Sequence, residues 1–386
     1  MPSGQKQQNI VDTQSVEGEI ARPAVSHRYE LRSLVLQPTG FCNISCRYCY
    51  LANRENPARM QLAVARTIAS RADEFGSSLN LVWHAGEPLS VGEPYLRELF
   101  ECFEPLRRAG RVVHAIQTNG TLIDDAWCAF FKEFAVSIGL SIDGPAHLNR
   151  ERVDRAGRET FERVIRGAEA LKRHGVPFST ISVVSSVEPE IAGDLLIFLR
   201  GLGGTSAAFN VVERDGASLA VGLDDVSAGR FWRELRLAWE RDPDLPIREV
   251  QQVLEFARFN CLTPQAGAPA IDWLLSIDFR GRVRALSPEL MEMRSERYND
   301  YVVADVAHDT LETAIANARR SAYVQEFFAG IERCAAQCDY FAFCRGGSLS
   351  NKLAEQGDAG ATETRYCKQS RQLVWDAFAP MLLEEC

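Results

Sequence analysis

The sequence predicts an α/β protein, with a partial TIM-like (β/α)6 barrel followed by a small cysteine-rich domain. Between residues 34 and 212, short apolar strands alternate with amphipathic helices, which is the pattern of parallel βαβ units. Six units are too few for a closed eight-stranded barrel, so the barrel is expected to be open. Beyond residue 260 this alternation stops, and four of the 11 cysteines fall between residues 334 and 367.

The elements of the barrel follow from apolar runs and their boundaries. Strands are expected at 34–38, 79–84, 112–117, 135–142, 177–184 and 207–212, and helices near 57–75, 94–108, 124–133, 160–174 and 188–200. Asp124 is suited to begin the third helix, and Gly175 to end the fourth before Pro177. In such folds the chemistry lies on the loops after the strands, so site residues are sought there.

The rest of the chain divides into a linker and a second domain. Helices with a turn at 242–246 are expected to link the two domains, and a hairpin at 274–279 and 282–286 follows. A helix at 309–319, a cysteine-bearing loop and a C-terminal helix from about residue 368 complete the prediction. The expected units are an N-terminal extension (1–30), the barrel (31–215), the linker (216–260) and the cysteine-rich domain (261–386).

Composition excludes several classes of protein. A net charge of -9 argues against nucleic-acid binding, which needs a clustered basic surface. Residues 1–30 lack the apolar run of a signal peptide, and nowhere are there 18 consecutive apolar residues, so a cytoplasmic protein without a membrane span is expected. Because thiols stay reduced in that compartment, clustered cysteines indicate metal or cluster ligands instead of disulfides.

Three cysteines follow the first strand directly. Cys42, Cys46 and Cys49 lie on one loop, and thiolates are the ligands that iron–sulfur clusters prefer. Three ligands leave one iron of a [4Fe–4S] cube open, as a catalytic site requires. A structural zinc ion would need a fourth ligand, and the nearest candidate, His84, is a strand away. The third interpretation of these three cysteines is that they are ordinary buried thiols.

The spacing Cys-x3-Cys-x-aromatic-Cys, with Tyr48 as the aromatic residue, resembles the defining motif of the radical S-adenosylmethionine (radical SAM) superfamily. The resemblance implies that the open iron binds S-adenosylmethionine. It also implies reductive cleavage to a 5′-deoxyadenosyl radical, which removes a hydrogen atom from the substrate. A flavodoxin- or ferredoxin-type protein would then donate the electron. The resemblance covers residues 34–212.

The loop after the second strand supports the same resemblance. Residues 84–88 (His-Ala-Gly-Glu-Pro) are similar to the family's Gly-Gly-Glu-Pro loop, with Ala85 in place of the first glycine. The family pattern implies that Gly86 and Glu87 bind the ammonium group of S-adenosylmethionine. Gly86 permits close backbone approach and Glu87 offers an anionic acceptor. A strand-ending turn with a solvated glutamate is the alternative.

Further candidates lie at the ends of later strands. Asn119 and Ser141 match family positions that line the cofactor cleft, and Asp143 is assigned to the catalytic set, although Asn and Asp also form turns for local reasons. Arg152 is suited to pair with the cofactor carboxylate, or else is a solvated basic residue. Ser182 is assigned to the ribose hydroxyls, with an ordinary strand residue as the alternative.

The second cysteine group resembles the SPASM domain, a C-terminal extension of radical SAM enzymes that modify peptides and proteins. That domain commonly holds two auxiliary clusters. Leu286 and Ser348 stand at the positions of two cysteine ligands of the first auxiliary cluster, and Cys261 is a possible remnant of its ligand set. One auxiliary [4Fe–4S] cluster is therefore expected, with zinc as the alternative. Its four ligands would be Cys334, Cys338, Cys344 and Cys367.

Three stretches, 83–88, 287–290 and 344–367, resemble the cyclophane-forming peptide maturases, which join an aromatic side chain to a Cβ in a ribosomally made precursor peptide. The predicted substrate is therefore such a peptide, and the auxiliary cluster would accept the electron released by the ring. Sulfatase maturation is the runner-up, although its acidic base would stand at Ser287, with Glu289 two residues later. Thioether formation is a third candidate, and a non-catalytic iron–sulfur or zinc protein that binds a partner is a fourth.

Overall fold

Nine strands of the described chain form a single sheet in the order β6-β5-β4-β3-β2-β1-β7-β8-β9. The structure is a computed structural model that describes residues 30–384 except 189, 217, 219 and 263–272. The strands are β1 (Leu31–Leu36), β2 (Leu79–Trp83), β3 (Val112–Thr118), β4 (Ser137–Ser141), β5 (Phe178–Val184), β6 (Ala207–Val211), β7 (Trp273–Ile277), β8 (Arg282–Ala285) and β9 (Ala304–Asp305).

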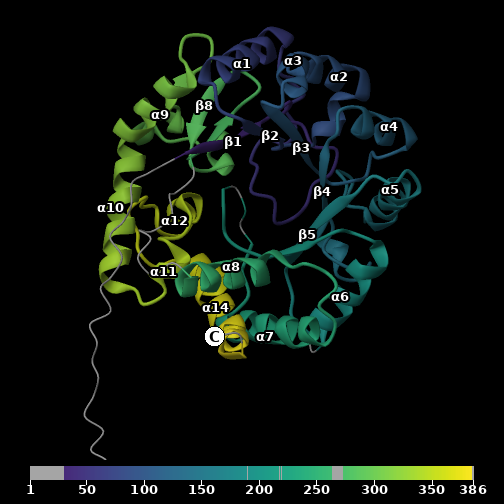
Figure 1. The fold of residues 1–386 in the computed structure, drawn as a ribbon, viewed down its shortest axis with the longest axis vertical. Helices are drawn as coiled ribbons and strands as arrows, with labels where there is room; N and C mark the ends of the chain where they lie inside the picture. The colour runs from purple at the N-terminus through teal and green to yellow at the C-terminus, as the bar shows by residue number, and fades with distance from the viewer. Residues whose placement is uncertain (1–29, 189, 217, 219, 263–272, 385–386) are drawn as a thin grey trace, which may run out of the picture.

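Strands β1 to β6 pair in parallel, and the helices that connect them lie along the outer rim of the curved sheet (Figure 1). These helices are α1 (Leu62–Phe75), α2 (Glu93–Glu101), α3 (Glu104–Arg108), α4 (Asp125–Glu133), α5 (Phe161–Arg173) and α6 (Ile191–Leu202). Helices α7 (Asp225–Arg241) and α8 (Arg248–Leu262) follow β6. The predicted α/β class and the open six-unit barrel are confirmed.

One detail of the predicted barrel differs, and two predicted helix ends are present. The helix expected near 94–108 is divided, because Pro105 has no backbone N–H to continue the turn that ends α2, and α3 begins there instead. The expected cap at Asp124 is present, since its carboxylate accepts a hydrogen bond from the Trp127 N–H at 3.0 Å. Gly175 adopts φ +62° directly after α5, as a chain leaving a helix favours.

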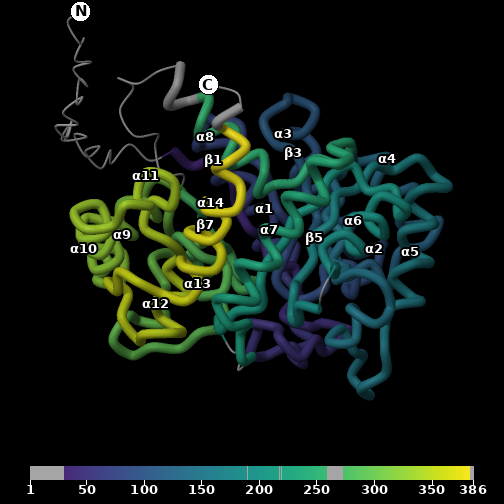
Figure 2. Tube along the Cα trace, turned by 90° about the horizontal axis from the view of Figure 1, so that it is seen from below, coloured from purple at the N-terminus to yellow at the C-terminus, as the bar shows by residue number. Residues whose placement is uncertain are grey.

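The C-terminal region lies beside the barrel in Figure 2 and is richer in helix than predicted. Its helices are α9 (Leu311–Arg320), α10 (Ala322–Gln337), α11 (Phe341–Cys344), α12 (Leu349–Gln356), α13 (Arg365–Cys367) and α14 (Leu373–Phe378), with a π-turn at Lys368–Gln372 between the last two. The expected loop around Cys334 is wrong, because α10 extends through this residue. Its buried face, which includes Tyr323, Val324 and Phe327, repeats at helical spacing.

The predicted hairpin is present as β7 and β8, but it is not separate from the barrel. Strand β7 pairs in parallel with β1, so that Leu34 lies opposite Leu275, and the barrel sheet continues into the C-terminal region. Both leucines are fully buried. The residues on either side of this join therefore share one core.

Aromatic side chains fill the space between the sheet and the outer helices. Trp83 stacks on Phe100 of α2 at 4.8 Å between ring centroids, and its indole N–H donates to Nδ1 of His114 at 3.0 Å. Burial lowers the pKa of His114 to about 3, so the ring is neutral and accepts this bond.

Among the helices within residues 30–384 that are described, none has the length and apolar character needed to cross a bilayer.

Candidate active site

A cavity of about 420 Å³ lies on the inner side of the barrel, where strands β2 to β6 end. Alternation along the strands decides which side chains reach it. Gln117 of β3, Ser141 of β4 and Ile181 of β5 face the cavity, whereas their neighbours in the strands pack against the helices. The opening is therefore at the C-terminal edge of the sheet, as expected for this fold.

The cysteine loop forms one wall of this cavity. Cys42, Cys46 and Cys49 all line it, although they come from a loop without regular structure. Backbone hydrogen bonds fix the loop: the Cys42 N–H donates to the Arg54 carbonyl at 3.0 Å, and the Arg54 guanidinium returns a bond to the Cys46 carbonyl at 2.8 Å. The three thiols predicted as ligands are thus brought together at one end of a space that can hold a ligand.

Polar hydrogens point at two of these sulfurs. Nδ2 of Asn119 lies 3.8 Å from Sγ of Cys42, and Nη1 of Arg152 lies 3.9 Å from Sγ of Cys46. Burial raises the pKa of Cys46 to about 11, against the influence of Arg152, and raises the pKa of Cys42 further. Thiolates at these positions therefore require a positively charged partner, which a metal cluster supplies.

The donor set, three thiols that line one cavity, is of the kind that holds an iron–sulfur cube. In the described parts of the chain, no three His, Cys, Asp or Glu side chains converge on a point that would hold a single metal ion. A zinc ion draws its ligands to about 2.3 Å from one centre. The thiolates of a cube bind different corners and stand farther apart. Cys42, Cys46 and Cys49 are suited to hold such a cube, with hydrogen-bond donors beside two of the sulfurs.

The loop after β2 packs directly on the start of the cysteine loop. Gly86 adopts φ +97°, and a Cβ placed on it would lie 2.4 Å from the carbonyl oxygen of Thr39 and 2.9 Å from that of Phe41. The next residue, Glu87, donates its backbone N–H to the same Phe41 carbonyl at 2.8 Å. Ala85 also adopts a positive φ of 68°, which a glycine would accept without strain.

The Glu87 side chain lines the cavity and is buried. Its carboxylate accepts hydrogen bonds from the Thr118 hydroxyl at 2.7 Å and from the backbone N–H groups of Leu89 at 3.0 Å and Asn119 at 2.8 Å. Burial nevertheless raises the pKa of Glu87 to about 7. The residue therefore ties the second loop to the end of β3 while part of its carboxylate stays available to the cavity.

Asp143 stands behind the cavity wall. Its carboxylate accepts from the Tyr48 hydroxyl at 2.5 Å and from the Val183 N–H at 2.9 Å, and pairs with Nε of Arg152 at 3.0 Å. Tyr48 and Arg152 line the cavity, whereas Asp143 does not. Asp143, placed in the catalytic set from sequence, thus holds two cavity residues in position.

The remaining predicted residues divide into two groups. Asn119 and Ser141 line the cavity, and Ser141 accepts a hydrogen bond from Nε2 of Gln117 at 2.8 Å. Ser182 does not reach it. This serine is fully buried on the helix-facing side of β5 and donates to the Ile142 carbonyl at 2.7 Å, because it alternates with the cavity-facing Ile181.

The four C-terminal cysteines also lie close together. Burial raises the pKa of Cys334, and the neighbouring Cys338 and Cys367 raise it further. The pKa of Cys344 is raised to about 11, chiefly by burial and also by Cys367. Gly346 and Gly347 adopt φ +96° and +77° in the turn after Cys344 that wraps this group.

A buried lysine accompanies these thiols. Lys352 of α12 is 1% exposed, and its Nζ has no hydrogen-bond partner among the described residues. The nearest ring is Phe327, whose centroid lies 4.9 Å from Nζ. Cys334, Cys344 and Cys367 lie close enough for their charges to favour the protonated amine, while burial lowers its pKa. An ammonium in this position needs an anion beside it.

Sequence reasoning did not place an acidic group at this side of the cavity, although it noted Glu289 near the position of the base of sulfatase-maturating enzymes. Glu213 and Asp215 follow β6, and Glu289 comes from the turn Pro288–Met291 after β8. All three carboxylates line the cavity. Glu213 and Asp215 follow a strand that was predicted, so the strand-end rule would have found them. Glu289 required knowledge that the β7–β8 hairpin joins the barrel sheet.

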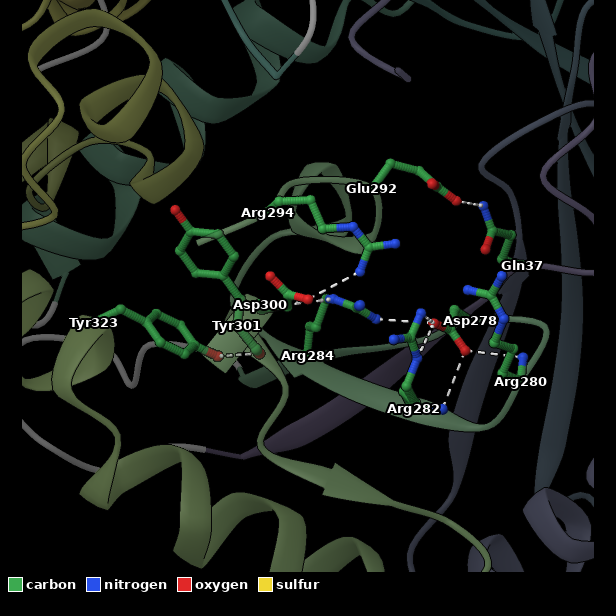
Figure 3. A network of polar contacts seen from close by, with 10 residues as sticks. All are labelled: Gln37, Asp278, Arg280, Arg282, Arg284, Glu292, Arg294, Asp300, Tyr301 and Tyr323. Atoms are coloured by element: carbon green, nitrogen blue, oxygen red, sulfur yellow. Dashed lines mark hydrogen bonds and ion pairs between the residues drawn. The ribbon is translucent and has the colours of Figure 1, made fainter. Parts of the chain in front are cut away.

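A polar network holds that hairpin in place (Figure 3). Asp278 accepts hydrogen bonds from the backbone N–H groups of Arg280 at 2.9 Å and Arg282 at 3.1 Å, and pairs with the fully buried guanidinium of Arg284 at 3.1 Å. Leu286, at the position of the missing cysteine, adopts φ +75° and donates its N–H to the Leu274 carbonyl at 2.7 Å.

Residues 36–192 match the family model of the Radical SAM superfamily. The chain carries a radical SAM domain. This domain spans β1 to the start of α6 and includes the cysteine loop, and its family implies a [4Fe–4S] cluster and S-adenosylmethionine as cofactors. The chain is thus a radical SAM enzyme, and Cys42, Cys46 and Cys49 are the residues here that are suited to hold the cluster.

Related proteins extend the likeness beyond this domain. An uncharacterized protein of Synechocystis sp. is 28% identical over 379 residues, which is 95% of each chain. The serine-type anaerobic sulfatase-maturating enzyme of Klebsiella pneumoniae is 33% identical over 223 residues, about half of each chain (54% and 56%). The solved structure of native anSMEcpe with bound AdoMet and Cp18Cys peptide has a TM-score of 0.73 at 21% identity, covering 91% of this radical SAM enzyme and 98% of that chain. The last comparison shows a shared fold.

Proposed function

We propose that this radical SAM enzyme modifies a ribosomally made precursor peptide by forming a carbon–carbon cross-link between an aromatic side chain and a Cβ. The observation that carries the proposal is the cavity itself. The cysteine loop lies at one end, and a wall with both apolar and polar residues leads from it to the C-terminal region. The solved anSMEcpe structure holds the Cp18Cys peptide together with AdoMet, which supports a peptide as the substrate class.

When bound, S-adenosylmethionine supplies the radical that removes a hydrogen atom from the peptide. The chain's own residues orient the reactants. Asn119 and Arg152 direct hydrogen-bond donors at the sulfurs of Cys42 and Cys46. Asp143 keeps Arg152 in place. The cross-link then removes two hydrogens from the peptide, one as a hydrogen atom and one as a proton with an electron.

The same proposal assigns an auxiliary [4Fe–4S] cluster to Cys334, Cys338, Cys344 and Cys367. Lys352 supports it, because a buried ammonium without a partner is costly unless an anion lies beside it. Four thiolates around a cube are such an anion. A closed four-thiolate site is suited to accept the electron from the aromatic ring and has no open iron for a substrate.

Sulfatase maturation is a second candidate, because specific observations favour it. The Klebsiella pneumoniae relative is a sulfatase-maturating enzyme. Glu289, two residues after the position of the acidic base expected for that family, lines the cavity. Its hydroxyl neighbour Ser287 donates a hydrogen bond to the carboxylate. In this second case the substrate is a serine or cysteine of an unfolded sulfatase segment.

The deciding experiment is anaerobic incubation of the reconstituted enzyme with reductant, S-adenosylmethionine and the small peptide encoded beside the gene. We expect a loss of two hydrogens for each cross-link, located between two residues by tandem mass spectrometry. A sulfatase-derived peptide in a parallel reaction tests the second candidate, for which the product is an aldehyde at the serine or cysteine. An unmodified precursor peptide together with 5′-deoxyadenosine formation would overturn the cross-linking proposal.

Iron counting tests the cluster number. About eight irons per chain are expected for two cubes. A Cys344→Ser/Cys367→Ser double variant should retain about four, and a Cys42→Ser/Cys46→Ser double variant should also retain about four. A value near twelve in the parent would contradict the assignment of a single auxiliary cluster, and a value near four would remove that cluster.

A further inference from the structure

Three carboxylates gather at the end of the cavity that faces the C-terminal region. Glu213 and Asp215 come from the segment after β6, and Glu289 comes from the turn after β8. Asp215 is 8% exposed. Burial and their mutual proximity raise the pKa of both Glu213 and Asp215. Three acidic groups from two distant parts of the chain thus line the same part of the cavity.

Within the described chain, the hydrogen bonds to these carboxylates come from neutral groups, which include the backbone N–H of Gly216 beside Asp215. Asn351 donates to Glu213 at 3.0 Å, Ser350 donates to Asp215 at 3.1 Å, and Ser287 donates to Glu289. No lysine or arginine of the described residues forms an ion pair with any of the three. The second carboxylate oxygen of Asp215, Oδ1, is buried and has no hydrogen-bond partner there.

That unpartnered oxygen indicates a missing donor. Leaving a buried carboxylate oxygen without a hydrogen bond costs about 1–3 kcal/mol, and more when the group is charged. Asp215 lines the cavity, so a ligand that enters from the barrel comes to lie next to this side chain. The ligand best suited to three such acceptors is a cation that donates several hydrogen bonds.

The arrangement does not suit a single metal ion. Carboxylates that bind one Mg²⁺ or Ca²⁺ bring their oxygens to within about 2.0–2.6 Å of one point. Among the described residues, no three acidic, histidine or cysteine side chains converge on one point. This includes the side chains of Glu213, Asp215 and Glu289. A larger organic cation, whose N–H groups point in different directions, matches the wider spacing.

We propose that Glu213, Asp215 and Glu289 form a binding site for a cationic side chain, lysine or arginine, of the peptide substrate. The inference rests on the proposed function and adds which kind of substrate side chain the enzyme recognises. Tyr50 directly follows Cys49 and lines the cavity together with Asp215, and a Cβ on Gly216 would lie 2.5 Å from the Tyr50 carbonyl oxygen, so the acidic segment packs against the end of the cysteine loop. A peptide anchored by its cation would then extend past Tyr50 toward the cysteine loop.

The position of the hydrogen bonds also connects this site with the C-terminal region. Ser350 and Asn351 are the second and third residues of α12, and Lys352 is the next. One short helix therefore contacts the acidic site with two side chains and reaches the four-cysteine group with a third. Substrate anchoring and the proposed electron acceptor share this helix.

The test measures binding without turnover. Reconstituted enzyme saturated with S-adenosylmethionine is titrated calorimetrically, without reductant, with Nα-acetyl-lysine methylamide and with the norleucine analogue, which has no charge. We expect the lysine probe to bind at least tenfold more tightly. Asp215→Asn should abolish that difference while keeping the bond from Ser350, and Glu213→Gln should reduce it. Asp244→Asn, which changes an exposed carboxylate, is the matched control.

Three results would overturn the proposal. They are equal binding of the two probes to the parent, an unchanged preference in Asp215→Asn, and a loss of S-adenosylmethionine affinity in that variant with the lysine preference intact. The last result would assign the carboxylates to the cofactor. Formation of 5′-deoxyadenosine after reduction is measured in the same preparations, so failure of the radical chemistry is distinguished from failure of the cation site.

Discussion

The hydroxyl of Tyr48 lies 2.5 Å from Oδ2 of Asp143, and this hydrogen bond joins the cysteine loop to the end of β4. The other carboxylate oxygen pairs with Arg152 at 3.0 Å. The side chains of Asp143 and Arg152 are 1% and 7% exposed. A single buried carboxylate thus positions two neighbouring side chains, and one of them, Arg152, contacts the sulfur of Cys46.

Asp143→Asn is expected to destabilise the protein strongly. The amide keeps the shape of the side chain but leaves the Arg152 guanidinium buried without a counter-charge, and breaking such a pair costs about 3–5 kcal/mol. Urea unfolding of the cluster-free protein measures the change. Asp125→Asn, which removes an exposed partner of Arg173, should leave the unfolding midpoint unchanged. A small effect of Asp143→Asn would show that water enters this site.

Gly86→Ala is expected to displace the cysteine loop. The added methyl group would lie 2.4 Å from the Thr39 carbonyl, so the two loops must move apart. Iron content after reconstitution should fall by about half, because one of the two proposed clusters is lost. Gly157→Ala is the matched control, since Gly157 also has a positive φ of 76° but nothing within 4 Å of a new Cβ. Equal iron loss in both variants would attribute the effect to backbone strain alone.

Lys352→Met is expected to stabilise the cluster-free protein but to weaken the reconstituted protein. In cluster-free protein, methionine replaces a buried ammonium that has no partner, so the free energy of unfolding should rise by about 1–3 kcal/mol. In reconstituted protein, the same change removes the counter-charge of the four thiolates. Iron should then be lost faster to a chelator, and the auxiliary midpoint potential should become more negative. Lys132→Met, at an exposed lysine, should do neither; a rise in stability in both states would contradict the cluster assignment.

Asp215→Asn is expected to alter the pH dependence of stability. Burial above all raises the pKa of Asp215 to about 8, whereas an unfolded aspartate titrates near about 4. Between these values the folded protein holds a proton that the unfolded chain has released, so the contribution of Asp215 to stability is complete below pH 4 and is lost as pH rises toward 8. The variant should therefore gain stability relative to the parent from pH 5 to pH 8.5 in urea unfolding. If the stabilities of the parent and the variant depend on pH in the same way, the pKa of Asp215 is near its ordinary value and the prediction is wrong.

The barrel and the cysteine loop could be predicted because their signals are local. Apolar runs mark the strands, and Cys42, Cys46 and Cys49 lie within one short loop. It was harder to predict which face of the sheet each strand residue is on, because a register difference of one residue reverses the face. Ser182 was assigned to the cavity side for that reason, but it is on the other side. The placement of Asp143 behind Tyr48 and Arg152 is a tertiary relationship that no spacing encodes.

Long-range pairing was beyond the sequence pattern. The parallel contact between Leu34 and Leu275 joins segments that are far apart in the sequence, and the hairpin signal gave no partner for its outer edge. For the same reason, the meeting of Asp215 with Glu289 in one cavity could not be foreseen. Helix α10 was missed because the expected importance of Cys334 suggested a loop, although Tyr323 and Phe327 repeat at helical spacing.

The pairing of β1 with β7 has a consequence for synthesis on the ribosome. Strand β1 leaves the exit tunnel among the first described residues, but its second edge stays open until β7 has been made, after all six barrel strands. During that interval the N–H and C=O groups along β1, next to the cysteine loop, are exposed to other nascent chains. Insertion of the first cluster is therefore expected to follow synthesis of β7, and truncated chains that end before residue 273 should aggregate instead of binding iron.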